Sequence, residues 1–242
     1  MTLLLLQKFC PISKILVGKG RRTVYQAVIF DMDGTLFQTD KILELSLEDT
    51  FDFLRSQNKW NTRTPIEKYR EIMGVPLPKA WETLLPNHSS EERQQVDSYF
   101  LDRLVENIRR GRGALYPNTK EIFEYLQEID CSIFIASNGL TQYLRTIVSY
   151  YHLDKWVTET FSIQQIESLN KSELVKYILD KFDMHEGAVV GDRLSDIKAA
   201  KDNDLISIGC HFDFDREEEL SQADFVINDL IELKDIFQGL NK

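Results

Sequence analysis

The chain has 242 residues, 43% of them hydrophobic and 28% charged, which describes an ordinary globular protein with room for one large domain or a core and a smaller companion. Its 39 acidic and 29 basic residues give a formal net charge of −10, which argues against a nucleic-acid binder because such proteins need a basic surface. Cys10, Cys131 and Cys210 are widely spaced and form no CxxC pair, so we expect free thiols and a cytoplasmic location.

Residues 1–22 form a basic, glycine-punctuated leader of uncertain role. Its apolar run, Leu3 to Leu6, is too short for the core of a signal peptide, and no basic residue precedes it. No window of the sequence approaches the roughly 18 apolar residues of a spanning helix, so we expect no membrane partner. An extra edge strand and a loose tail are both compatible with the leader.

From Gln26 onward, short apolar runs alternate with amphipathic helical patterns. Such uninterrupted runs are typical of strands buried on both faces of a parallel sheet. The runs are AVIF (27–30), SIFIA (132–136), GAVVG (187–191), LISIG (205–209) and DFVI (224–227), with TFSI (160–163) as a weaker candidate. Helical patterns at 122–129, 143–151 and 174–182 lie between them. This order predicts an α/β protein with a doubly wound parallel-sheet, Rossmann-like core.

One long interval breaks the alternation. Residues 38–113 contain no convincing strand but several helical patterns, the longest of them opened by Ser89 or Ser90. We therefore expect a core formed by residues 1–37 and 114–242, with 38–113 inserted as an all-helical cap. The insertion ends at Gly111 and Gly113, which fit either a flexible hinge or a simple helix stop.

The strongest chemical signal is Asp31-Met32-Asp33-Gly34-Thr35, directly after the first predicted strand. Ligands of open α/β sheets bind at the carboxyl ends of strands, where these carboxylates would lie. Two carboxylates this close repel each other and call for a cation or a shared proton. A calcium-binding loop would have its glycine at the sixth position, so that alternative fits poorly, whereas a polar turn that caps the strand stays open.

Three further sites follow later elements. Asp192 and Asp196 come after the strand GAVVG, four residues apart, and can face one centre if a helical turn begins between them. Ser137 and Asn138 follow SIFIA in a strand-to-helix loop, which can offer a hydroxyl and backbone N–H groups to an anion. Lys171 opens the helix 171–183, where a cation opposes the helix dipole at a small cost. A solvated side chain is possible there, but a role against a phosphate explains the lysine better.

Together these residues resemble the four motifs of the haloacid dehalogenase-like hydrolases, in the same order. The inserted helices resemble the cap of the phosphoglycolate phosphatase-like and β-phosphoglucomutase-like branch, and the resemblance covers about residues 25–238. The sequence departs from this branch at Gln38 and Thr39, at Arg193, and at Asn203-Asp204, where a glycine is usual. We expect Gln38 and Arg193 to lie near the site, where they affect the substrate and not the reaction.

The resemblance implies a phosphatase that hydrolyses a small phosphorylated metabolite. Asp31 would be the nucleophile that forms an aspartyl-phosphate, and Asp33 the general acid and base. Mg²⁺ would bind Asp31, the backbone carbonyl of Asp33, and Asp192. Asp196 would hold the water ligands of the metal or orient Lys171. Ser137, Asn138 and Lys171 would hold the phosphoryl oxygens.

Two other functions remain compatible with these motifs. A phosphomutase of the β-phosphoglucomutase type would use the same site, with a hydroxyl of the substrate as the acceptor in place of water. A catalytically silent binding protein with this fold is less compatible, because every side chain needed for turnover is present. We expect a monomer or a weak dimer.

Overall fold

The computed structural model describes residues 26–72, 75–212 and 217–240. Six parallel strands form one sheet in the order β3-β2-β1-β4-β5-β6. The strands are β1 (Ala27–Phe30), β2 (Ser132–Ser137), β3 (Glu159–Ser162), β4 (Gly187–Gly191), β5 (Ile206–Cys210) and β6 (Phe225–Ile227). The chain builds the sheet outward from β1 in one direction and then in the other, so the strand order reverses at β1, where α/β proteins bind ligands. The predicted fold class is confirmed.

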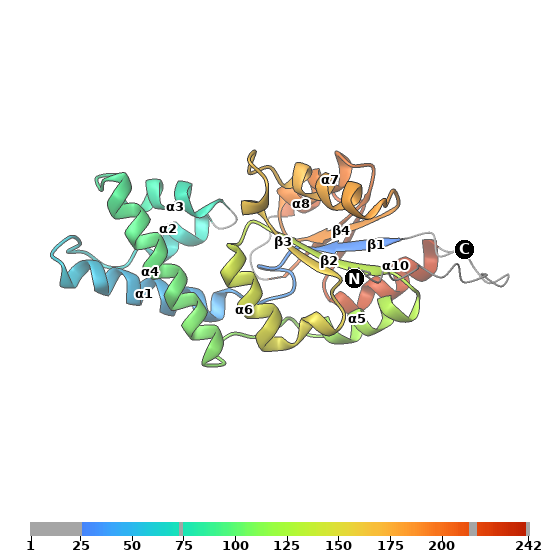
Figure 1. Ribbon diagram of the computed structural model, residues 1–242, viewed down its shortest axis with the longest axis horizontal. Helices are drawn as coiled ribbons and strands as arrows, with labels where there is room; N and C mark the ends of the chain where they lie inside the picture. The colour runs from blue at the N-terminus through green and yellow to red at the C-terminus, as the bar shows by residue number, and fades with distance from the viewer. Residues whose placement is uncertain (1–25, 73–74, 213–216, 241–242) are drawn as a thin grey trace, which may run out of the picture.

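Helices cover both faces of this sheet (Figure 1). α7 (Lys171–Phe182) and α8 (Leu194–Lys201) lie on one face, and α5 (Thr119–Glu128) and α10 (Leu233–Leu240) lie on the other. The side chains of β1 alternate between the two cores, with Ile29 packed on the α7 side and Phe30 on the α5 side. All four residues of β1 are buried, which explains why this strand contains no polar residue.

The remaining helical elements are of two kinds. The helices are α6 (Thr141–Tyr151) and the short α9 (Glu217–Leu220), and the 3₁₀ turns are η1 (Leu153–Lys155), η2 (Ile163–Gln165) and η3 (Leu230–Glu232). Where a glycine is usual after α8, Asp204 takes the left-handed conformation (φ 55°). The Asn203 amide donates to the carbonyls of Ser172 and Ala199 at 2.9 and 2.8 Å.

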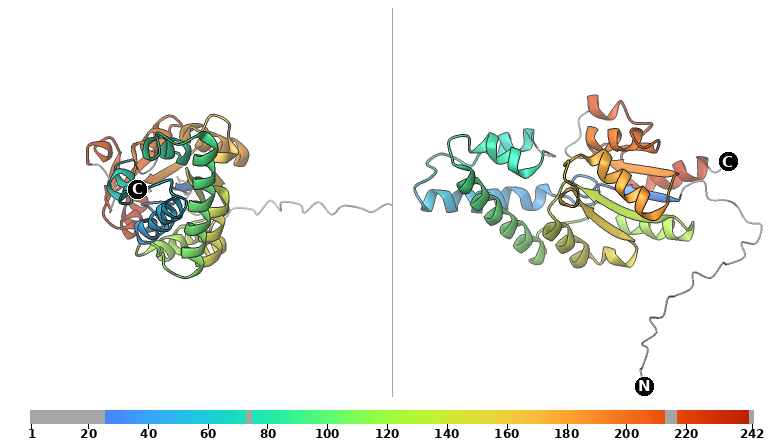
Figure 2. Two further views of the ribbon diagram at one scale, coloured as in Figure 1. Left: turned by 90° about the vertical axis from the view of Figure 1, so that its left-hand side faces the viewer. Right: turned by 45° about the horizontal axis from the view of Figure 1, so that its top comes forward.

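Residues 38–113, the predicted helical cap, contain four helices that lie beyond the carboxyl ends of the strands (Figures 1 and 2). They are α1 (Asp40–Ser56), α2 (Ile66–Glu71), α3 (Leu77–Leu84) and α4 (Ser90–Arg109). Ser89 caps α4, and Glu92 returns the bond, which completes the predicted capping box. Fully buried Phe51, Trp81 and Phe100 give the cap an apolar interior. Its status as a separate domain stays a prediction.

The two segments that join the cap to the sheet lie side by side. The backbone N–H of Gln38 donates to the carbonyl of Ala114 at 2.9 Å, and its side-chain amide donates to the carbonyl of Leu115 at 2.6 Å. The N–H of Tyr116 donates to the carbonyl of Leu36 at 2.9 Å. Gln38 therefore hydrogen-bonds the two connecting segments to each other and does not line the active-site cavity, which corrects our expectation from the sequence.

Gly111 and Gly113 lie where other segments approach the backbone closely. Gly111 has φ 71°, and a Cβ atom there would lie 2.6 Å from the hydroxyl of Tyr150. A Cβ atom at Gly113 would overlap the ring of Phe37. The positive φ of Gly111 and the packing at Gly113 both favour glycine, so alanine substitution would destabilise the fold whether or not the segment bends. A hinge at this point stays a prediction.

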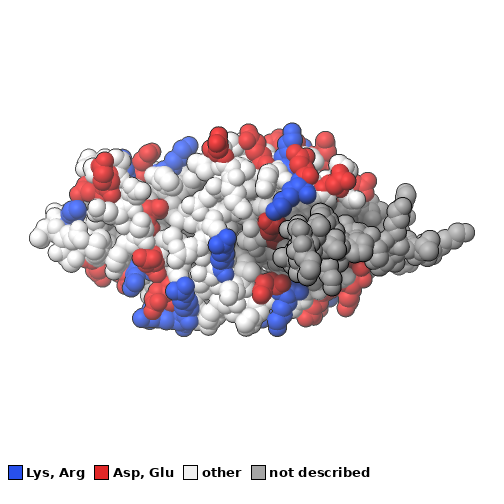
Figure 3. Space-filling model, in the orientation of Figure 1, with Lys and Arg blue, Asp and Glu red and all other residues white. Residues whose placement is uncertain are grey.

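The surface carries charges of both signs. On the face shown in Figure 3, acidic and basic side chains are interspersed, with a largely uncharged strip between the cap and the sheet. Cys131 and Cys210 are buried free thiols, as predicted, whereas Cys10 and the rest of residues 1–22 lie outside the described residues. Among the helices described, none is long and apolar enough to cross a membrane.

Candidate active site

Three neighbouring strands deliver the predicted site residues to one edge of the sheet. β1 pairs with β2 and with β4, so Asp31 after β1, Ser137 at the end of β2 and Asp192 after β4 come together. Lys171, the first residue of α7, and Asp196, in the first turn of α8, reach the same point. All five side chains are buried, although four of them are charged. Burial of so many charges is costly unless they are paired, so this cluster marks a functional site.

Asp31, Asp192 and Asp196 form an acidic triad in which the carboxylate oxygens lie within 4.8 Å of one another. Lys171 Nζ lies 2.5 Å from Asp31 Oδ1 and also forms an ion pair with Asp196. Burial raises the pKa of Asp31 to about 7, and the Lys171 ammonium opposes that rise.

A divalent cation fits the acidic triad on chemical grounds. Burial, followed by repulsion from Asp31 and Asp196, raises the pKa of Asp192 well above its usual range. One ammonium against three buried carboxylates leaves negative charge that is not neutralised. Oxygen ligands of this kind are those that hard divalent cations prefer.

The glycines of the two acidic motifs make room for this triad. Gly34 has φ 77°, and a Cβ atom there would overlap the Asp192 carboxylate. A Cβ atom at Gly191 would overlap the side chain of Asp196. Thr35 donates a long hydrogen bond of 3.4 Å to Asp192 Oδ1, a contact that sequence reasoning did not assign. Gly34 thus lets the first motif approach Asp192 of the second motif, and Gly191 makes room for Asp196 within its own motif.

Asp33 lies beside the triad and is held by two hydroxyl groups. Thr39 Oγ1 and Tyr143 Oη each donate to Asp33 Oδ1 at 2.5 Å, and both donors are buried. Burial raises the pKa of Asp33, and these two hydrogen bonds oppose the rise. Because both bonds reach Oδ1, the second oxygen, Oδ2, is the one left to carry a proton.

Neither hydroxyl group was predicted from the sequence. In the sequence, Thr39 is one of the departures from the family pattern, and Tyr143 is the first residue of the helical pattern 143–151. The available signal for Tyr143 was a phenol at the start of a mostly aliphatic helical face that begins just after the Ser137 loop.

The remaining predicted residues surround the same cavity. Ser137 Oγ accepts the N–H of Gly139 at 3.0 Å, which holds the loop in shape, and Asn138 lines the cavity beside it. Asn170 caps α7, because its Oδ1 accepts the N–H of Ser172 at 2.8 Å. Asp196 accepts the N–H of Arg193 at 3.1 Å, so its second oxygen is free to face Lys171.

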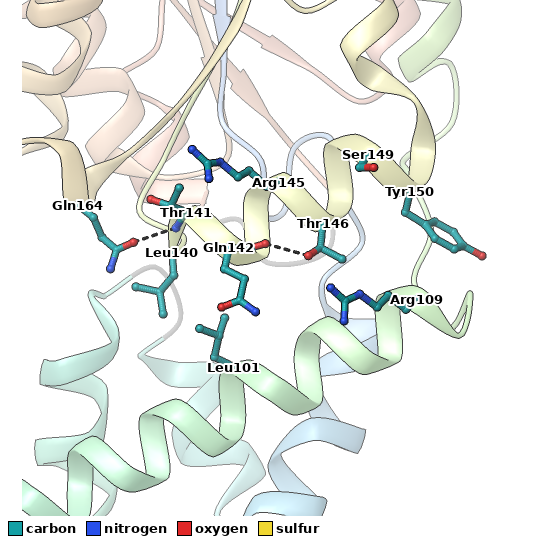
Figure 4. Close-up of a pocket in the computed structure, with 10 residues that line it drawn as sticks. All are labelled: Leu101, Arg109, Leu140, Thr141, Gln142, Arg145, Thr146, Ser149, Tyr150 and Gln164. Atoms are coloured by element: carbon teal, nitrogen blue, oxygen red, sulfur yellow. Dashed lines mark hydrogen bonds between the residues drawn. The ribbon is translucent and has the colours of Figure 1, made fainter.

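The cavity has a volume of about 100 Å³ and lies between the strand ends and the cap. All the site residues predicted from the sequence line it, as do Arg193, Thr39 and Tyr143. A second, larger cleft of about 760 Å³ lies between α4 and α6 and shares Leu101 and Leu140 with the first (Figure 4). It contains none of the carboxylates described above.

The fold and this site define an α/β enzyme with a carboxylate centre suited to a divalent metal. The haloacid dehalogenase-like hydrolase family matches residues 25–204, and the chain belongs to that family, whose members use a divalent metal. A 5'-nucleotidase of Pseudomonas aeruginosa is 22% identical over 89% of this chain and 96% of its own length. A phosphoglycolate phosphatase of Vibrio vulnificus is 21% identical over 86% and 94%.

Solved structures agree with this assignment at the level of the fold. The crystal structure of a predicted phosphoglycolate phosphatase from Haemophilus somnus superposes with a TM-score of 0.77, at 20% identity, over 88% of this chain and 98% of that one. The match of the family model over residues 25–204 confirms the family predicted from the four motifs.

Proposed function

We propose that the chain is a Mg²⁺-dependent phosphatase that hydrolyses a small phosphomonoester through an aspartyl-phosphate on Asp31. The observation that carries the proposal is the convergence of Asp31, Lys171 and the acidic triad at three adjacent strand ends. The phosphatases among the similar proteins support the same class of enzyme, a phosphoric monoester hydrolase.

Asp31 is placed to attack phosphorus. Lys171 holds Asp31 Oδ1 at 2.5 Å, which orients the carboxylate and leaves its other oxygen for the attack. In the same position the ammonium lies beside the incoming phosphoryl group and stabilises the charge on its oxygens. Ser137 and Asn138, at the end of β2, offer a hydroxyl and an amide to the other phosphoryl oxygens.

Asp33 is placed to move the proton. A raised pKa lets its carboxyl group remain protonated until it donates to the departing alkoxide. The resulting carboxylate then accepts a proton from the water that attacks the aspartyl-phosphate. Thr39 and Tyr143 stabilise this carboxylate through Oδ1 and direct Oδ2 toward the reacting oxygen.

The proposed ligands of Mg²⁺ are Asp31, Asp192 and the backbone carbonyl of Asp33. Asp196 does not bind the metal directly in this proposal. The metal supplies Lewis-acid charge that offsets the repulsion between the carboxylates and the phosphate. Asp196 has one oxygen on the backbone of Arg193 and the other toward Lys171, so it fixes the position of that cation.

The cap favours water over a sugar hydroxyl as the acceptor. A phosphomutase must hold a second polar substrate group, whereas the cap side of the cavity is mostly apolar. This observation supports hydrolysis over the phosphomutase alternative. The cytoplasmic location and the monomeric or weakly dimeric state stay predictions from the sequence.

Hydrolysis of p-nitrophenyl phosphate tests the proposal. We expect turnover with Mg²⁺, no turnover after exhaustive chelation, and inhibition by Ca²⁺, whose looser coordination misplaces the nucleophile. Asp31→Asn should fall below about one per cent of the unmodified rate because the covalent route is lost. Full activity after chelation would contradict the proposal. So would an Asp31→Asn protein that keeps more than about one per cent of the unmodified rate.

A further inference from the structure

Two chemically different walls enclose the active-site cavity. The wall formed by the core carries the carboxylates, Ser137 and Lys171. The wall formed by the cap consists of Leu43, Tyr69, Val75, Leu77, Phe100, Leu101 and Leu104. Among the described residues, this cap wall contains no charged side chain. The polar groups that the cap brings to the cavity are the hydroxyl of Tyr69 and that of Thr39, which donates to Asp33.

The cations that line the cavity belong to the core and are already engaged. Lys171 forms ion pairs with Asp31 and Asp196, and Arg193 Nε lies 3.5 Å from Glu219 Oε2. Two arginines of the cap–core junction, at positions 109 and 145, line the neighbouring cleft instead (Figure 4). A second anionic group of a substrate that lies against the cap wall would therefore meet apolar carbon and no cation of that wall.

We propose that the natural substrate is the phosphate ester of a small, uncharged and predominantly apolar alcohol, an inference that rests on the proposed phosphatase activity. The phosphate binds at the strand ends, and the alcohol lies against the cap wall. A carboxylate or second phosphate on the alcohol would lose its water without gaining a cation. The hydroxyls of a sugar would lose their water and would find few partners on the cap side, namely Tyr69 and Thr39, whose own proton is donated to Asp33.

The dimensions of the cavity agree with a small alcohol. Its volume of about 100 Å³ is below the roughly 300–1,000 Å³ of ordinary ligand pockets. Leu43, Phe100 and Leu104 are buried in the cap, so these side chains cannot move to enlarge the cavity without disrupting the packing of the cap interior. A nucleoside would require the cap helices to move apart.

Three phosphate esters of similar size separate the possible substrate classes. Propyl phosphate carries an apolar alcohol, glycerol 1-phosphate a polar one and phosphoglycolate an anionic one. With the unmodified enzyme and Mg²⁺, we expect kcat/KM for propyl phosphate to exceed that for phosphoglycolate by about a hundredfold, and that for glycerol 1-phosphate by about tenfold.

A charge placed on the cap wall tests the source of this selectivity. Leu101 is half-buried and lines the cavity, so Leu101→Lys should raise kcat/KM for phosphoglycolate relative to propyl phosphate by at least about tenfold. Leu101→Met, which keeps the size and adds no charge, should leave the ratio unchanged. An unchanged ratio in Leu101→Lys would show that the cap wall does not select the substrate, and would overturn the inference.

The outcomes also separate this inference from the proposed function. Phosphoglycolate or glycerol 1-phosphate hydrolysed as fast as propyl phosphate would overturn the inference and leave the phosphatase standing. Cleavage of p-nitrophenyl phosphate with all three small esters inert would overturn the choice of a small alcohol. Failure of all four esters would refute the phosphatase activity itself.

Discussion

The hydrogen bond from Tyr143 to Asp33 should control the pH dependence of the enzyme. Tyr143 Oη donates to Asp33 Oδ1 at 2.5 Å from a buried position. A hydrogen bond to a charged acceptor contributes about 1.5–3 kcal/mol, and about 1.4 kcal/mol corresponds to a tenfold change in an ionisation constant. Tyr143→Phe removes a donor that stabilises the carboxylate, so the pKa of Asp33 rises further.

The sign of the effect on activity follows from the role of Asp33. Because Asp33 must be protonated to donate to the alkoxide, kcat/KM for an alkyl phosphate falls when pH rises above its pKa. In Tyr143→Phe this alkaline limb should move upward by about 1–2 pH units. Thr39→Val should move it in the same direction, since Thr39 donates to the same oxygen.

The assay is a kcat/KM profile for propyl phosphate over the range in which the fold is stable. Tyr125→Phe, on the outer helix α5, is the matched control and should leave the profile unchanged. The substrate must have a poor leaving group, because p-nitrophenolate departs without an acid. An alkaline limb that stays in place, or moves downward, in Tyr143→Phe would refute the assignment of Asp33 as the acid.

Three further predictions concern the metal-free protein and the packing of the cap. In EDTA, Lys171→Met should lower the free energy of unfolding in urea by about 3–5 kcal/mol, because Asp31 and Asp196 lose their buried partner; no loss would contradict the pairing. Since burial raises the pKa of Asp31 from 3.8 to about 7, the folded metal-free protein holds a proton that the unfolded chain releases. Its stability should therefore fall as pH rises from about 4 to 7, and the fall should be smaller in Asp31→Asn; equal falls would argue against this ionisation. Gly113→Ala should destabilise by about 1–3 kcal/mol through overlap with Phe37, whereas Gly239→Ala, in open space on α10, should not lower the melting temperature.

The sheet could be predicted from the sequence because each strand has a local signal. Residues 27–30 and 187–191 are uninterrupted apolar runs, and the structure places β1 and β4 at those positions. The sheet also brings the motif residues together, since parallel strands present their carboxyl ends at one edge. The family and the class of enzyme followed from those residues and are confirmed.

The supporting contacts could not be predicted because they join distant segments. Tyr143 and Asp33 are separated by 110 positions, and Thr35 and Asp192 by 157. Which hydroxyl faces which carboxylate depends on how α6 lies against the first motif, and periodicity shows only that a helical face is buried. The same limit explains Gln38. Its position in the sequence suggested that it lies near the active site, but its amide hydrogen-bonds the two segments that join the cap to the sheet.

Trapping the covalent intermediate tests the central claim most directly. Enzyme mixed with Mg²⁺ and a ³²P-labelled phosphomonoester, then quenched and digested, should carry the label on the peptide that contains Asp31. Asp33→Asn should retain more label than the unmodified enzyme when the leaving group needs no acid, because the water that releases the phosphate lacks its base. Asp31→Asn should carry none. Label on another peptide, or turnover by Asp31→Asn at the unmodified rate, would contradict an aspartyl-phosphate at this position.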